Sequence, residues 1–250
     1  MSNRIRTNRS NGPWTIGEIF ERMRALGDPR NVQGMARFGI SVAPEMAFGL
    51  TSAEMKALAH EIGRNHELAL SLWDTGNHDA RHLAHMIAEP EKFTEATAES
   101  WARDFNSWDI VDGVCLYLLI YTPFAWKKAR EWPKREEEFV RRAGFSVMAY
   151  LAVHDKSAPD TRFIGFLPRI ERYSDDGRNF VKKAVNWALR QIGKRNVRLN
   201  RAAVAAAKRI RERGTPSARW IAADALRELE SDAVQRRLRT RDRPCRAGDD

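Results

Sequence analysis

Apolar residues recur along most of the chain at helical spacing, and short turns separate the segments that they define. Between residues 15 and 230, nearly every segment places its apolar positions three or four residues apart rather than on alternate residues. The breaks between segments contain Gly, Pro, Asp or Asn, which favour turns. The pattern therefore predicts an all-α protein with about a dozen helices of roughly 8 to 20 residues.

Local signals indicate where several of these helices begin. The sequence TSAE at 51–54 is a capping box, and APD at 158–160 and TP at 215–216 predict two later helix starts. Paired helices at fairly even spacing favour a solenoid of stacked repeats over a closed bundle. The predicted helices that show this spacing are 135–154, 161–173, 178–194, 197–213 and 217–230.

The two ends of the chain depart from the helical pattern. Residues 1–13 and 232–250 are charged and poor in apolar side chains, so we expect both to be disordered, with one repeat domain over 14–231. The longest apolar stretch, 110–126, contains Asp112 and Pro123 and is too short to span a bilayer. The N-terminal residues also lack the hydrophobic segment of a signal peptide. We therefore expect a cytoplasmic protein that does not use a membrane.

Charge narrows the choice of partner. The 250 residues include 43 Lys and Arg against 33 Asp and Glu, which gives a net charge of +10. An excess of this size favours a polyanion, with nucleic acid first and an anionic membrane surface second. Cys115 and Cys245 are too few for a disulfide framework or a four-cysteine zinc site, and we interpret both as free thiols.

Cofactor and metal chemistry find little support in the sequence. The chain has no Walker loop and no GxGxxG, CxxC or GxSxG motif, so we expect no cofactor. His78, His82 and His85 have the spacing of metal ligands, and Asp79 lies beside them. Because Leu83 and Met86 make the same segment an ordinary amphipathic helix, we expect no metal there.

The segment FVKKAVNWALRQIGK, from residue 180, contains a tryptophan in an unusual setting. Trp187 falls on the face of the predicted helix that carries Lys183, Arg190 and Lys194. A partner that offers both phosphates and an apolar sugar surface would suit such a stripe, although Trp187 serves equally well as a second packing contact. The opposite, apolar face consists of Val181, Val185, Ala188, Leu189 and Ile192.

Two further segments place polar side chains beside apolar surfaces. Trp108 and Asp112 are four residues apart and share a helix face, so the carboxylate must be hydrogen-bonded, paired or chemically employed. A bond to a neighbouring helix turn would satisfy it equally well. In the segment from 136 to 155, Arg142 and Ser146 lie opposite the apolar face. Arg142 is therefore able to face a ligand, although a solvated arginine is the simpler interpretation.

Taken together, these segments resemble the AlkD-like family of DNA glycosylases. The resemblance covers most of residues 35–230 and includes MARFGI from 35, LALSLWDTGNHDARHLA from 68, DFNSWDIVD from 104, VRRAGF from 140 and FVKKAVNWALRQIGK from 180. It implies a solenoid of HEAT-like helical repeats with a concave, basic, DNA-binding face. It also implies that Asp112 is the catalytic aspartate and that Trp108 and Trp187 contact the deoxyribose of the damaged nucleotide.

The resemblance further implies that Arg142 lies beside the phosphate backbone. The resemblance also places Phe38 at the DNA, where relatives carry a tyrosine in a MAR(Y/F) setting, and so implies that a hydroxyl contact near the lesion is absent. From the charge pattern we expect Lys183, Arg190 and Lys194 to contact DNA phosphates as well.

The expected function is hydrolytic excision of cationic N3- or N7-alkylated purines, such as 3-methyladenine and 7-methylguanine, from double-stranded DNA. We expect a monomer that needs no metal, no cofactor and no obligate protein partner. Two alternatives stay open: a non-catalytic member of the same fold that binds DNA structures, and a helical-repeat scaffold in which Trp187 anchors a protein partner.

Overall fold

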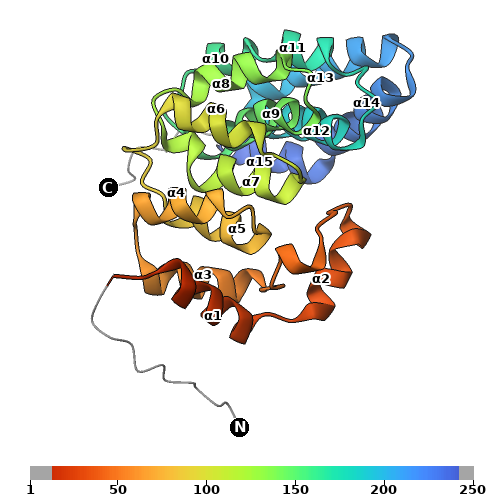
Figure 1. Ribbon diagram of the computed structural model, residues 1–250. Helices are drawn as coiled ribbons and strands as arrows, with labels where there is room; N and C mark the ends of the chain where they lie inside the picture. The colour runs from red at the N-terminus through yellow and green to blue at the C-terminus, as the bar shows by residue number, and fades with distance from the viewer. Residues whose placement is uncertain (1–12, 242–250) are drawn as a thin grey trace. The chain divides into compact units, whose positions relative to one another are not determined.

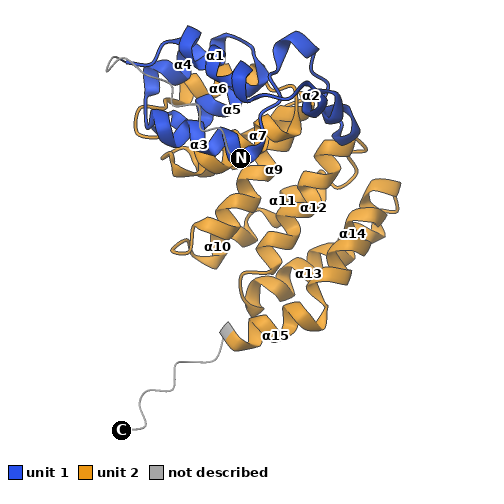
Figure 2. Ribbon diagram, turned by 90° about the horizontal axis from the view of Figure 1, so that it is seen from below, with its two compact units in different colours: residues 1–89 blue, residues 90–250 orange. Residues whose placement is uncertain are grey.

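The computed structural model describes residues 13–241, and every regular element in that range is a helix (Figure 1). Most of the two predicted disordered ends, together with Cys245, lies outside the described residues. None of the helices in the described range is both long and apolar enough to cross a bilayer. Where the sequence predicted one domain over 14–231, the chain divides into two compact units, residues 1–89 and 90–250 (Figure 2).

The described part of unit 1, from residue 13 on, is built from five α-helices and two short 3₁₀ helices. Residues 51–54 form the predicted capping box at the start of α3, and Thr15 and Glu18 form a second one at the start of α1. Helix α5 packs against both α3 and α4. The elements are α1 (Ile16–Leu26), α2 (Pro29–Met35), η1 (Ala36–Phe38), η2 (Pro44–Met46), α3 (Ser52–Ile62), α4 (His66–Asp74) and α5 (His78–Ile87).

Unit 2 begins at residue 90 and contains the remaining elements. They are α6 (Glu95–Arg103), α7 (Trp108–Tyr117), η3 (Leu119–Tyr121), α8 (Ala125–Glu131), η4 (Trp132–Lys134), α9 (Glu138–His154), α10 (Asp160–Ile164), α11 (Leu167–Arg172), α12 (Asn179–Gly193), α13 (Val197–Glu212), α14 (Pro216–Leu229) and α15 (Asp232–Arg241). The predicted helix starts at 160 and 216 are confirmed.

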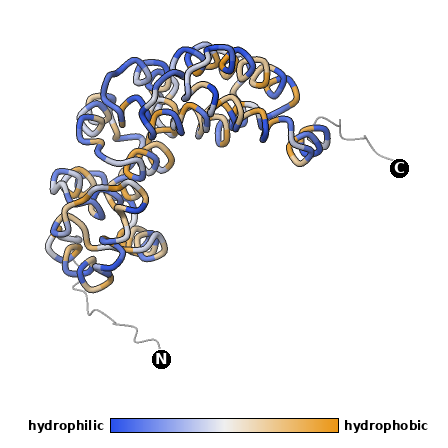
Figure 3. The backbone as a smooth tube through the Cα atoms, turned by 90° about the vertical axis from the view of Figure 1, so that its right-hand side faces the viewer, coloured by the Kyte–Doolittle hydropathy of each residue, from blue (hydrophilic) through white to orange (hydrophobic). Residues whose placement is uncertain are grey.

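The helices of unit 2 form two rows. One row runs α7, α9, α12 and α14, in which each helix packs against the next. Helices α8, α11 and α13 cover this row, packing against α9, α12 and α14 respectively. Hydrophobic and hydrophilic positions alternate around the turns of these helices, as amphipathic helices between two layers require (Figure 3). This arrangement is the predicted stack of helix pairs.

A glycine sets the position of α9, the longest helix in the described range. A Cβ atom added at Gly144 would lie 2.3 Å from Cδ of Pro133, far inside van der Waals contact. Helix α9 therefore approaches η4 closely because residue 144 has no side chain. The flanking turns of α9 carry the polar side chains discussed below, so this contact also fixes the part of the helix that carries them.

The prediction of one helix over 161–173 was wrong. The segment forms α10 and α11, which are separated at Gly165 and Phe166. Pro168 explains the break, because it has no N–H to donate to the carbonyl of Ile164 and its ring would clash with that carbonyl in a continuous helix.

The prediction of a disordered tail from residue 232 was also wrong for residues 232–241, which form α15. Val234 and Leu238 are four residues apart and both are buried. The side-chain amide of Gln235 donates to the carbonyl of Leu229 at 2.7 Å and to Oδ1 of Asn200 at 3.1 Å. Two apolar anchors and one amide thus suffice to dock a segment that is otherwise highly charged.

Candidate active site

Asp112 lies on α7, the first helix of the row α7, α9, α12 and α14 in unit 2. Helix α7 begins at Trp108, and its buried face includes Ile110, Val111 and Val114. Asp112 lies one turn after Trp108 and its side chain keeps 18% of its surface exposed. A carboxylate with so little contact with water needs partners in the protein.

Helix α9 supplies these partners. The guanidinium of Arg142 places Nη2 at 2.7 Å from Oδ2 of Asp112, and the hydroxyl of Ser146 donates to Oδ1 at 2.9 Å. Arg142 and Ser146 are four residues apart, so they project from one face of α9. Arg142 also donates through Nη1 to the carbonyl of Phe180 at 2.9 Å, which ties α7 and α9 to the start of α12. Three helices therefore hold one carboxylate in a single orientation.

These contacts set opposing influences on the proton affinity of Asp112. Burial raises the pKa of Asp112 above its ordinary value, because the ionised form loses hydration. The positive charge of Arg142 and the hydrogen bonds from Arg142 and Ser146 act in the other direction. Protonation of Asp112 therefore sets in at a higher pH than for a carboxylate in water.

Aromatic side chains flank the carboxylate. The guanidinium of Arg142 lies 6.0 Å from the centre of the Trp108 ring. On the next pair of helices, the rings of Tyr150 and Trp187 meet edge to face with centroids 4.7 Å apart. Burial, and after it the charge of Asp112, raise the pKa of Tyr150. Tyr150 thus contacts Trp187 and lies within the electrostatic influence of Asp112.

Trp108, Asp112, Arg142 and Trp187 were predicted as site residues from the sequence, whereas Tyr150 was not. Its signal was nevertheless present, since Tyr150 follows Ser146 by four residues and Arg142 by eight along α9. The sequence also presented Arg142 as a surface side chain, but only 6% of the residue is exposed. Its burial reflects the ion pair with Asp112, which local spacing does not reveal.

The predicted faces of α12 are confirmed. Every residue of the predicted apolar face is fully buried, whereas Lys183 is exposed and Trp187 is half-buried. The two other predicted cations are not simply exposed, however. Nη1 of Arg190 lies 2.7 Å from Glu228, and Nζ of Lys194 lies 2.7 Å from the same carboxylate. An acidic side chain of α14 therefore neutralises part of the predicted basic stripe.

The remaining predicted residue, Phe38, lies in unit 1 and is 68% exposed at the end of η1. Asp79, which stands beside the histidines of α5, has a structural role. Its carboxylate accepts the backbone N–H groups of Phe48 at 2.6 Å and Gly49 at 3.0 Å. These bonds fix the loop before α3.

Comparison with known proteins agrees with this architecture. The model of a family described as DNA alkylation repair enzyme matches residues 19–229. An uncharacterized protein of Listeria innocua is 21% identical over 199 residues, which cover 78% of this chain and 86% of the relative.

A solved structure aligns with 78% of this chain and 83% of its own, at a TM-score of 0.71 and 25% sequence identity. It is described as belonging to a new family of proteins related to the HEAT-like repeat DNA glycosylases, with affinity for branched DNA structures. The predicted all-α, HEAT-like repeat fold is thereby confirmed. With a family match that spans most of its length, the chain belongs to the AlkD-like family of DNA alkylation repair enzymes.

Proposed function

We propose that this protein is a DNA glycosylase that hydrolyses the N-glycosidic bond of cationic N3- or N7-alkylated purines in duplex DNA. The observation that carries the proposal is the setting of Asp112, a carboxylate held by Ser146 and by Arg142, whose guanidinium lies 6.0 Å from the centre of the Trp108 ring. A side chain so firmly oriented, yet 18% exposed, remains accessible to a substrate.

An alkylated purine of this kind already carries a positive charge. It leaves with the bonding electron pair as a neutral base, so the enzyme needs no strong general acid. As the bond from C1′ to the purine nitrogen breaks, positive charge grows on the deoxyribose. The carboxylate of Asp112 stabilises that charge and orients the water whose oxygen adds to C1′, while the proton released from the water passes to the carboxylate or to solvent.

The aromatic side chains add a second contribution. In this proposal Trp108 and Trp187 lie against the sugar, and their ring faces attract it more strongly as it becomes cationic. Each such contact is worth on the order of 0.5 to 2 kcal/mol. Because the attraction increases along the reaction, it accelerates bond cleavage rather than merely strengthening binding.

The DNA backbone would lie along the face of α7, α9 and α12. Lys183 is the exposed cation of α12, and Arg190 and Lys194 would contribute after exchanging part of their contact with Glu228 for phosphate. Arg142 holds Asp112 and Phe180 with its two Nη atoms, so its contribution is mainly to position the carboxylate.

A second candidate function is binding of DNA structures without excision. The observation that favours it is the solved relative, which is described as having affinity for branched DNA structures. In that case Arg142 and Asp112 would form a purely structural ion pair, and the basic and aromatic residues of α12 would bind a DNA junction.

One experiment separates the two functions. The protein, in excess, is incubated with a duplex that carries 7-methylguanine, and free base is measured after subtraction of spontaneous depurination. In parallel, binding to a four-way junction and to the matched duplex is compared at equal salt. Enzyme-dependent base release supports the glycosylase. A preference for the junction with no base release supports the binder and contradicts the glycosylase.

A further inference from the structure

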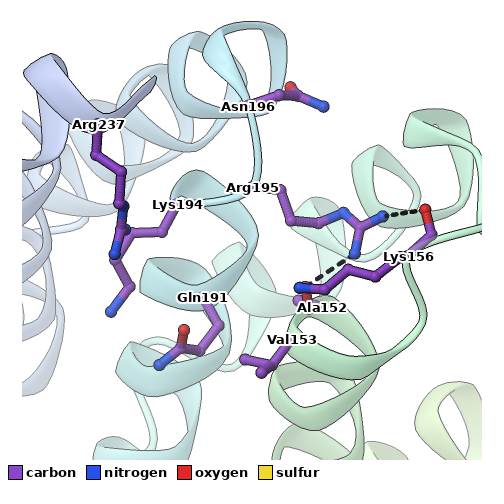
Figure 4. A pocket seen from close by; sticks show the side chains of 8 residues that line it. All are labelled: Ala152, Val153, Lys156, Gln191, Lys194, Arg195, Asn196 and Arg237. Carbon is purple, nitrogen blue, oxygen red and sulfur yellow. Dashed lines mark hydrogen bonds between the residues drawn. The ribbon is translucent and has the colours of Figure 1, made fainter. Parts of the chain in front are cut away.

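Unit 2 contains a pocket of about 560 Å³ that the proposed reaction does not use (Figure 4). Side chains from the ends of α9 and α12, the start of α13 and the middle of α15 line it. Four of its eight lining residues are cationic, and none of the eight is acidic. The four are Lys156, Lys194, Arg195 and Arg237.

The pocket continues the candidate active site along the same two helices. On α9, the lining residue Val153 follows Tyr150 by three positions, and on α12, Gln191 follows Trp187 by four. Residues at these spacings lie on one face of a helix. At a rise of 1.5 Å per residue, Lys194 lies about 10 Å along α12 from Trp187. A strand bound at the aromatic pair would therefore reach the pocket within a few nucleotides.

Each cation has a distinct environment. Arg195 donates through Nη1 to the carbonyl of Ala152 at 2.9 Å (Figure 4). The same Nη1 donates to the carbonyl of Asp155 at 2.8 Å, so Arg195 covers the negative end of α9. Nζ of Lys194 forms an ion pair with the carboxylate of Glu228 at 2.7 Å.

Lys156 and Arg237 are exposed and add positive charge from opposite sides of the pocket. With the helix end covered by Arg195 and no acid among the lining residues, the pocket favours an anion.

We propose that this pocket binds a phosphate of the DNA backbone, two to three nucleotides away from the nucleotide held at Asp112. The distance follows from the 10 Å offset along α12 and a rise of about 3.4 Å per phosphate along the axis of B-DNA. These values give about three nucleotides where the DNA axis is parallel to α12 and about two where it is oblique. The inference rests on the proposed function only in taking α7, α9 and α12 as the DNA face. It adds a specific contact at which the protein fixes the register of the strand.

The test combines a change in the protein with a change in the DNA. Each duplex in a set carries one abasic-site analogue, which marks the nucleotide expected at Asp112 and has no base to release. It also carries one neutral methylphosphonate, at successive positions on either side of the analogue, and dissociation constants are measured for each duplex. The protein variant is Lys156→Ala with Arg237→Ala. The matched control is Lys208→Ala with Arg211→Ala, which removes the same two charges from exposed positions of α13 outside the pocket.

For the wild type, we expect one methylphosphonate position, two or three nucleotides to one side, to weaken binding by about fivefold. The pocket variant should bind the duplex without a methylphosphonate roughly tenfold less tightly and lose about one unit of salt slope, because one phosphate contact is lost. At that one position, it should show no further loss. The control should keep the wild-type penalty there. The proposal would be overturned if the pocket variant kept the wild-type penalty at that position. It would also be overturned if the wild type showed no sensitive position.

The result is independent of excision, because the marked nucleotide has no base to release. If the wild type releases no base but the pocket variant abolishes the penalty at one position, the glycosylase proposal fails and the phosphate site stands. If base release occurs and the penalty is unaffected by the variant, the phosphate site fails alone.

Discussion

At the scale of single residues, the proposed reaction depends on whether the carboxylate of Asp112 is ionised. Asp112 stabilises a developing positive charge only while it is ionised, and burial raises its pKa. The ionised fraction is lost as the pH falls through that pKa. The rate of excision should therefore fall on the acidic side at a higher pH than the ordinary pKa of an aspartate would predict.

Ser146→Ala tests this point. The hydroxyl of Ser146 donates to Asp112 and lowers its pKa, so removing it should raise the pKa further. We expect the acidic limb of the single-turnover pH profile to move to higher pH, while the rate on the alkaline plateau changes little. Ser71→Ala, which removes an exposed hydroxyl on α4, is the control. An unchanged limb in the Ser146 variant would show that Asp112 does not govern the profile.

At the scale of elements, ion pairs join α12 to α14. Asp224 and Glu228 on α14 bind cations of α12, and Arg190 contacts both, at 3.3 Å and 2.7 Å. These pairs are partly exposed, with 29% of the Arg190 side chain accessible. Solvent screening therefore limits their contribution to the free energy of unfolding to about 1 kcal/mol. Lys183 lies on the same helix and is exposed.

Lys183→Ala and Arg190→Ala should therefore differ. The first should weaken duplex binding by about fivefold, reduce the salt slope by about one and leave the melting temperature unchanged. The second should also lower the melting temperature, by roughly 2 to 4 °C, because it leaves two carboxylates of α14 with fewer partners. Thermal unfolding and salt-dependent titration check both variants. Equal melting temperatures would contradict a structural role for the pairs of Arg190.

Also at this scale, the sequence predicted elements better than their contacts. Helical periodicity located α12, α13 and α14 nearly to the residue, and it placed the apolar face of α12 correctly. It could not predict that Glu228 takes up two cations 34 and 38 residues away, because that contact depends on how α14 packs against α12. Pro168 was visible in the sequence and should have divided the helix predicted over 161–173.

At the scale of the whole molecule, the net charge of +10 and the family agree on a DNA partner. Charge alone did not distinguish DNA from an anionic membrane surface. The segments around Asp112 and Trp187 resemble those of AlkD-like DNA glycosylases, and this resemblance favoured DNA. The family match over residues 19–229 supports the same partner. The residues of the candidate site could be named from the sequence. The ion pair between Arg142 and Asp112 became visible only with α7 and α9 packed side by side.

The central claim is that Asp112 stabilises the transition state of base excision through its charge. Asp112→Asn tests it most directly, since the amide keeps the shape of the side chain, can still accept from Arg142 and can donate to Ser146. Asp232→Asn, at an exposed position of α15, removes the same charge elsewhere. The measurement is single-turnover release of 7-methylguanine from a duplex, with binding and thermal unfolding recorded alongside.

We expect the Asn variant to bind duplex DNA as tightly as the wild type or slightly more tightly, and to release base about tenfold to a thousandfold more slowly. The Asp232 control should match the wild-type rate. Release at the wild-type rate by a folded, DNA-binding Asp112→Asn protein would contradict the account.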